Sequence, residues 1–370
     1  MLHLLLIAAA MLFLAGYNIY AQELKFTSNS IPVSEIRSKA ESGDALSQTA
    51  MGDAYVVGER VRIDLPEAIE WFKKAAIQGH GDAQSKLGRA YYFGTGVPKN
   101  EAEAVKWFQK AVQKGHPDAQ YNLASAYYFG TGVQKDLQEA TKLFRKAAEQ
   151  GHPDAQNSLG SAYYLGEGVT KDEVEAVNWF NKAAEQGQKE AQYNIGMAYY
   201  LGTGVPKNEA AGVKWIRKAA EQGHAKAIGI LVHAYYTGEG VPKDELEAFK
   251  WIKKAADNGD AKAQYTIGFS YRNGKGVPQD HAEAVKWLVK ASDQGNSDAQ
   301  LQLGFAYYMG DGVPKDHVLA YKWLLLSGAQ GNQIARKSIE VVERSLSVVR
   351  RVEGQRLAKE FQLQSKATTP

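Results

Sequence analysis

The stretch AYYFGTGVPKN (residues 90–100) decides the fold, because it recurs along the chain at a fixed interval. Taken alone, its glycines Gly94 and Gly96 could cradle a phosphate. Further copies of the tyrosine–glycine motif, 36 residues apart, begin at Tyr127, Tyr163, Tyr199, Tyr235, Tyr271 and Tyr307. A degenerate copy at Tyr55 has Arg60 in place of the second glycine. A constant period of this length indicates a repeat array, so we interpret the loop as part of the fold and disfavour a nucleotide site.

The segment 116–151 shows what one repeat contains. Ala119, Leu123 and Ala126 follow helical spacing, which predicts a first helix, called helix A. Pro117 suits the first turn of this helix, and Gly130 suits the left-handed conformation that ends one. No part of the segment has the alternating pattern of a strand.

A second helix, called helix B, follows the glycine loop. Asp136 is a typical N-cap, and Glu139 three residues later predicts a capping box. Equivalent pairs recur in other repeats, so these acids are interpreted as caps and not as catalytic carboxylates. The apolar face of helix B begins at Ala140 and Phe144, and the helix is expected to end before Gly151.

Helix pairs of this kind bury their apolar faces by stacking, which predicts an all-α solenoid. Residues 43–330 comprise about eight repeats of 36 residues. Residues 22–42 are assigned to a linker and N-terminal capping helix, and residues 331–370 to C-terminal capping helices and a tail. Residues 1–21 are largely apolar and uncharged. They predict a signal peptide cleaved near Ala21 and a periplasmic or secreted protein, with an uncleaved inner-membrane anchor as the alternative.

Composition excludes several classes of function. The chain has 44 Lys and Arg against 41 Asp and Glu, and both signs are interspersed, so it has no footprint for nucleic acid. Lysines that recur on helix B, such as Lys146 and Lys182, are interpreted as a solvated face. The absence of cysteine excludes disulfides, thiolate nucleophiles and cysteine-ligated metals.

The combined pattern is DAQ-x-x-LG-x-x-YY-x-G-x-GV-x-KD followed by EA-x-x-W-[FIL]-x-KAA-x-QG. It resembles the Sel-one-like repeat family, which is related to the tetratricopeptide repeats. The resemblance implies a right-handed α-solenoid of helix-turn-helix repeats with terminal caps, used as an adaptor or scaffold and frequent in bacterial envelopes. Some members resemble β-lactam-binding or β-lactamase proteins that are rich in cysteine. This chain has neither cysteine nor a Ser-x-x-Lys motif, which puts that activity in doubt.

The tryptophans and histidines follow the repeat. All seven tryptophans share one position of helix B, which Leu143 fills in the remaining repeat, so this position requires bulk and is interpreted as core. Equivalent histidines on successive repeats, such as His116 and His152, would lie too far apart to share a metal ion. Only His233, inside helix A, lies out of register. We therefore expect no catalytic residue, no metal site and no cofactor.

The helix A positions that vary between repeats form the candidate binding surface. They are spaced i, i+3 and i+7 and so share a face beside the core face. In related helical arrays helix A lines the concave side, which suggests a groove for a protein or peptide. The candidate partner-binding residues are Asn122, Ser125, Phe129, Asn194, Met197, Leu201, His233, Phe269, Phe305 and Met309. Local packing of these side chains against the loop is the alternative.

The sequence thus predicts a non-catalytic protein- or peptide-binding scaffold in the cell envelope. No contact with nucleic acid is expected, nor with the membrane beyond the possible N-terminal anchor. The alternative, by distant family resemblance, is a β-lactam-binding protein or β-lactamase-like hydrolase. A third possibility is a structural or oligomerising protein that uses its basic C-terminal cap.

Overall fold

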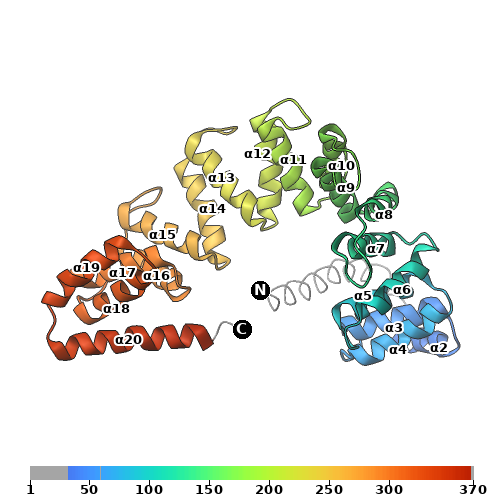
Figure 1. Ribbon diagram of the computed structural model, residues 1–370, viewed down its shortest axis with the longest axis horizontal. Helices are drawn as coiled ribbons and strands as arrows, with labels where there is room; N and C mark the ends of the chain where they lie inside the picture. Colours follow the sequence, from blue (N-terminus) through green and yellow to red (C-terminus); the bar gives the residue numbers. More distant parts are fainter. Residues whose placement is uncertain (1–31, 59, 368–370) are drawn as a thin grey trace. The chain divides into compact units, whose positions relative to one another are not determined.

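The computed structural model describes residues 32–58 and 60–367 of the chain. These residues form nineteen α-helices and no strand, which confirms the all-α solenoid (Figure 1). No helix among them is both long enough and apolar enough to cross a membrane. The predicted signal peptide or anchor at 1–21 lies outside the described residues.

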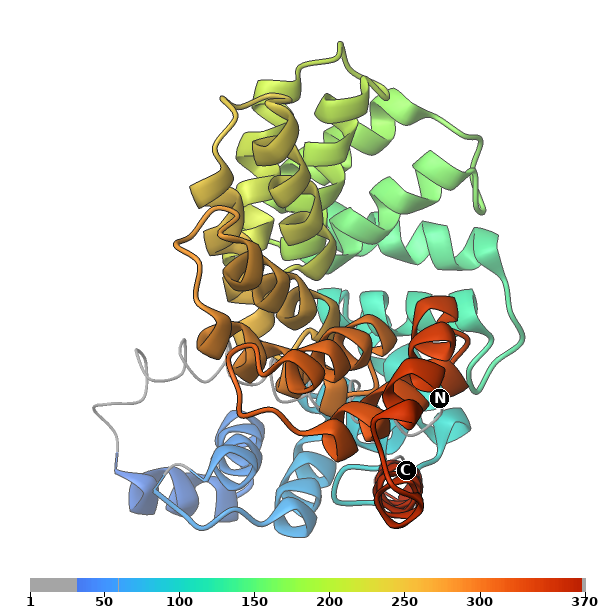
Figure 2. The same ribbon diagram turned by 90° about the vertical axis from the view of Figure 1, so that its left-hand side faces the viewer.

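Each repeat contributes one helix A and one helix B, which lie antiparallel and are joined by the glycine loop (Figures 1 and 2). The A helices are α3 (Ala45–Val57), α5 (Gly81–Phe93), α7 (Pro117–Phe129), α9 (Pro153–Leu165), α11 (Lys189–Leu201), α13 (Ala225–Thr237), α15 (Ala261–Asn273) and α17 (Ser297–Met309). The B helices are α4 (Leu65–Ile77), α6 (Glu101–Val112), α8 (Leu137–Glu149), α10 (Glu173–Glu185), α12 (Glu209–Glu221), α14 (Glu245–Asp257), α16 (His281–Asp293) and α18 (His317–Ala329).

Three further helices flank the repeats. Helix α2 (Val33–Glu41) precedes the first repeat, and α19 (Gln333–Arg344) and α20 (Val348–Ala367) follow the last. The chain divides into two compact units within the fifth repeat. The first unit comprises residues 1–191 and 203–205, and the second comprises residues 192–202 and 206–370.

In seven of the eight repeats the two helices pack closely, because helix A carries a glycine or alanine where helix B crosses it. A Cβ atom built on Gly160 would lie only 2.7 Å from the ring of Phe180. The equivalent distance from Gly304 to Leu324 is 2.8 Å. Helix B supplies most of the large side chains of this core, and the apolar face predicted for α8 is buried along its length. A larger residue at the glycine position would therefore force the helices apart.

The loop glycines have two different structural roles. Gly130 ends α7 in the left-handed conformation, with a φ of 73°. Gly132 also has a positive φ, and a Cβ atom there would lie 2.4 Å from the carbonyl carbon of Glu101 in the preceding repeat. The loop therefore rests on the first turn of the previous helix B, at a distance that only glycine permits.

The N-cap of helix B is confirmed, but the capping box is not. The carboxylate of Asp136 accepts hydrogen bonds from the backbone amides of Gln138 and Glu139, at 3.0 and 2.9 Å. The backbone amide of Asp136 donates to the carbonyl of Tyr127 at 3.0 Å. Because the returning loop already satisfies this amide, Glu139 is free to pair with Lys142 at 3.4 Å. The predicted reciprocal contact from Glu139 is therefore wrong.

Candidate functional site

The last residue of helix A carries an exposed apolar side chain in several repeats. In the first unit, Phe129 is 70% exposed and Leu165 is 58% exposed. In the second unit, Leu201 and Met309 are 59% and 64% exposed. Each residue precedes the left-handed glycine that ends the helix, so its side chain projects where the chain turns away. These positions provide apolar surface that the core does not use.

A second candidate position lies four residues earlier and is more varied. Phe269 is 40% exposed, whereas Met197 and Phe305 are half-buried against the core of their own unit. The hydroxyl of Ser125 donates to the carbonyl of Tyr121 at 3.0 Å, so part of its hydrogen-bonding capacity is used locally. This position therefore holds a locally packed side chain in some repeats and an exposed one in others.

The polar candidates lie on the same helices. Asn122 and Asn194 are half-buried. His233 is exposed, and its Nε2 atom lies 3.6 Å from a carboxylate oxygen of Glu239. Among the described residues, no group of His, Cys, Asp and Glu side chains could hold a metal ion. The candidate positions therefore carry both hydrogen-bonding and apolar side chains.

Three of the four recurring histidines, His80, His152 and His224, cap helix A, a role that the sequence interpretation missed. Nδ1 of His152 accepts from the backbone amide of Ala155 at 3.2 Å, and its ring stacks on Tyr121 at 4.9 Å. Other repeats place a different acceptor at this position, such as Asp260 or Asn296. That exchange among His, Asp and Asn was the available signal, because these side chains share the ability to accept from an amide at a helix start.

A buried glutamine near the start of helix A also went unrecognised. Nε2 of Gln156 donates to the carbonyl of Ala148, which ends the preceding helix B, at 3.1 Å. Its Oε1 atom accepts from Nε2 of Gln186 at 2.7 Å. The same glutamine pair recurs as Gln48–Gln78, Gln120–Gln150, Gln192–Gln222, Gln264–Gln294 and Gln300–Gln330. A buried amide whose partners come from two adjacent repeats fixes their register.

The lysines of helix B cover the tryptophans as well as facing solvent. Nζ of Lys182 lies 3.9 Å from the centroid of the Trp179 ring, which is only 6% exposed. Lys110 and Lys290 lie equally close to the tryptophans of their own repeats. These contacts are cation–π interactions, so these lysines serve packing within their own repeats. Five of the seven tryptophans, including Trp179, are buried, as the sequence predicts, whereas Trp107 and Trp215 are half-buried.

Comparison with known proteins identifies the repeat. The Sel1 repeat model matches residues 45–80, 81–116, 117–152, 153–188, 189–224, 227–260, 261–296 and 297–332. A search of curated proteins found no match.

Two solved structures resemble the chain over most of its length. A Sel1 repeat protein from Oxalobacter formigenes is 34% identical, with a TM-score of 0.58, over 86% of this chain and 92% of that one. A protective antigen of uropathogenic Escherichia coli with an SLR fold is 30% identical, with a TM-score of 0.42, over 90% of this chain and 94% of that one. Proteins built from Sel1 and related repeats are generally protein-interaction scaffolds and are typically non-catalytic. With eight matches along 45–332, the chain belongs to the Sel1 repeat family.

Proposed function

We propose that this protein is a non-catalytic scaffold of the cell envelope that binds a protein or peptide partner on the helix A face. The supporting observation is the series of exposed apolar side chains at the end of helix A, described above. The position tolerates Thr237 and Asn273 in other repeats, so the fold does not require an apolar residue there. Apolar side chains that the fold does not need and solvent can reach are suited to a partner surface.

The neighbouring positions suit a polypeptide partner. Half-buried Asn122 and Asn194 carry amides that can donate to and accept from a peptide backbone. Phe269 adds an aromatic side chain, the type most often found at the centre of interfaces. The helices that carry these groups are fixed by core contacts on their other side, so ordering them on binding costs little.

The envelope location rests on the apolar segment at 1–21, which is suited to export. No observation favours the β-lactam-binding or hydrolase alternative. The described residues carry no cysteine and no metal-binding group, and their recurrent acids serve as helix caps.

The test is partner capture with a matched surface control. The chain from Gln22 onward is immobilised, and proteins retained from a host envelope extract are identified by mass spectrometry. We expect one saturable partner whose binding is lost in the double variant Phe129→Ser, Leu165→Ser. Val174 lies on helix B of the same unit and is 59% exposed, so Val174→Ser should leave binding unchanged. Equal loss in both variants, or in neither, would reject the helix A face.

A further inference from the structure

The sixth repeat departs from the others at three positions of helix A. Ile228 replaces the buried glutamine that joins successive repeats. Gly229 follows it, where the flanking repeats have Tyr193 and Tyr265. Val232 stands where the other repeats have glycine or alanine. All three changes fall within two turns of α13, so they alter one patch of the molecule.

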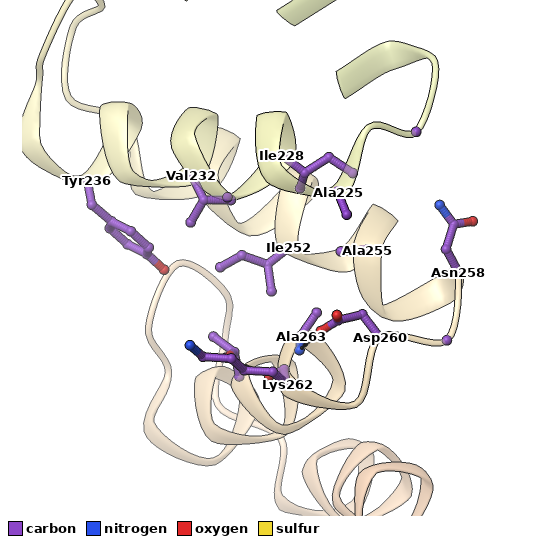
Figure 3. A pocket seen from close by; sticks show the side chains of 14 residues that line it. Ala225, Ile228, Val232, Tyr236, Ile252, Ala255, Asn258, Asp260, Lys262 and Ala263 are labelled. Carbon is purple, nitrogen blue, oxygen red and sulfur yellow. Dashed lines mark hydrogen bonds between the residues drawn. The ribbon is translucent and has the colours of Figure 1, made fainter. Parts of the chain in front are cut away.

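A cavity of about 780 Å³ lies at this patch. It is bounded by α13, by the second half of α14 and by the start of α15 (Figure 3). Figure 3 shows Val232 and Tyr236 projecting from α13 toward α15, with Lys262 on the opposite side. Ile228 and Ile252 complete an apolar wall. A volume of this size is within the range of pockets that hold small organic ligands.

The substitutions explain why the space exists. In the next repeat, a Cβ atom on Gly268 would already lie 2.9 Å from Leu288, so the valine at the equivalent position must hold α13 further from α14. A Cβ atom on Gly229 would meet no atom within 4 Å. In the preceding repeat this space is occupied by Tyr193, whose ring stacks on His224 at 4.4 Å. The sixth repeat thus removes one large side chain and widens the gap beside it.

The charge beside the cavity is also reversed. The second residue of helix A is acidic in most repeats, but it is Lys226 in α13 and Lys262 in α15. A lysine in the first turn opposes the positive end of the helix dipole. Lys262 lines the cavity, is exposed, and forms no salt bridge with the described residues. Asp260 also lines the cavity, but its carboxylate accepts from the amide of Ala263 at 2.6 Å as the N-cap of α15.

From this geometry we infer that the cavity binds an anionic amphiphile, with its apolar body against Ile228, Val232 and Ile252 and its carboxylate beside Lys262. An apolar wall with an unpaired ammonium group at its edge is complementary to a ligand of that form. The inference goes beyond the proposed scaffold function, because it concerns a different surface and requires no protein partner. Its failure would leave the docking face of Phe129 and Leu165 untouched.

The first experiment is calorimetric titration of the chain with decanoate, and with decanol as the neutral match. We expect saturable binding of decanoate that Gly229→Tyr weakens at least about tenfold, because tyrosine refills the cavity. Gly229→Ala is the control, since it adds one methyl group and should retain binding. Both variants should melt no lower than the wild type, because the site is open and glycine is a poor helix former. Unchanged binding in Gly229→Tyr would overturn the inference.

A charge variant tests the second half of the inference. Lys262→Glu should weaken decanoate binding about tenfold or more while leaving decanol binding unchanged, because only the anion interacts with the ammonium group. Lys337→Glu, at an exposed position on α19, is the matched control and should bind decanoate as the wild type does. Equal binding of decanoate and decanol to the wild type, or no saturable binding of either, would overturn the inference.

A final arm distinguishes the source of the carboxylate. A short peptide that ends in Leu-Phe with a free carboxylate is compared with its C-terminal amide. Binding of decanoate and of the free peptide but not of its amide, lost in Gly229→Tyr, would indicate the C-terminus of a polypeptide. Binding of decanoate without the peptide would indicate a free fatty acid.

Discussion

The fourth and sixth repeats use different residues to donate a hydrogen bond to the carbonyl near the end of the preceding helix B. In the fourth repeat, Gln156 satisfies the carbonyl of Ala148 at the end of the preceding helix B. In the sixth, Ile228 occupies the glutamine position, and the corresponding carbonyl of Ala220 accepts instead from Nζ of Lys254 at 3.2 Å. In both repeats this carbonyl accepts from a backbone amide and also from a side chain, and the repeats differ in which residue supplies that side-chain donor.

The compensation has a visible cost in the sixth repeat. Nζ of Lys254 lies 5.0 Å from the Trp251 ring, compared with 3.9 Å for Lys182 and Trp179 in the fourth.

The second repeat shows the opposite case, in which the loss of a glutamine is left uncompensated. Lys114 stands where a glutamine would pair with Gln84, and Oε1 of Gln84 is buried without a partner among the described residues.

The largest expected effect concerns the tryptophan position, which the regular and irregular repeats share. Trp179→Ala should lower the free energy of unfolding by about 3–5 kcal/mol, because a large buried ring is replaced by a cavity. Trp179→Leu copies the residue found at Leu143 and should cost less than half as much. Urea unfolding of the two variants measures the difference, and an alanine variant as stable as the wild type would contradict the core assignment.

The second prediction concerns a buried ion pair between the second repeat and the first. Nζ of Lys86 lies 2.6 Å from a carboxylate oxygen of Asp53, and both side chains are buried. Lys86→Met should cost about 3 kcal/mol at pH 8, because it leaves a buried carboxylate without its counter-charge. The loss should be smaller at pH 5, where Asp53 can take up a proton. Equal losses at the two pH values would show that the pair is not electrostatically coupled.

The same pair gives the wild type a pH dependence of known sign. Burial raises the pKa of Asp53 from 3.8 to about 6, against the opposing effect of Lys86. A raised pKa means that Asp53 favours folding below pH 3.8 and that this contribution is lost as the pH rises through about 6. Asp53→Asn should therefore flatten the stability profile between these values. A steeper profile in that variant would contradict the assignment.

A third prediction compares two lysines at the same position of helix B. Lys254→Met should cost about 1–3 kcal/mol, because it removes two hydrogen bonds, to the carbonyls of Ala220 and Glu221, worth about 0.5–1.5 kcal/mol each. Lys182→Met removes only a cation–π contact and should cost about 0.5–1 kcal/mol. Thermal unfolding of the two single variants tests the comparison. Equal costs would mean that Lys254 does not replace the missing glutamine.

The smallest effect is a repair of the second repeat. Lys114→Gln should raise the free energy of unfolding by about 0.5–1.5 kcal/mol, because the new amide can donate to the unpaired oxygen of Gln84. Gln113→Lys makes the reverse exchange at an exposed neighbouring position and should be nearly neutral. A repair variant less stable than the wild type would show that Lys114 has a role of its own.

The parts of the fold that could be predicted depend on residues close together in sequence. The end of α7 at Gly130 and the cap at Asp136 each follow from a few adjacent residues. The side-chain donor to Ala220 could not be predicted, because Lys254 is 34 residues away. The equivalent lysine of other repeats, such as Lys182, contacts a tryptophan instead. The sequence predicted which positions form the candidate face, but it did not predict how exposed their side chains are. The helical spacing could not distinguish exposed Phe129 from half-buried Phe305, because the difference depends on packing against neighbouring helices.

The second loop glycine also sets the order in which the repeats can be joined. Gly168 would place a Cβ atom 2.0 Å from the carbonyl oxygen of Leu137 in the repeat before it. In the first repeat this position is held by Arg60, which keeps the left-handed backbone with a φ of 62° but carries a full side chain. A copy of the first repeat grafted into the interior of the array would collide with its new predecessor. The repeats are therefore not interchangeable modules, and duplication of this gene segment could lengthen the array only from repeats that keep the glycine.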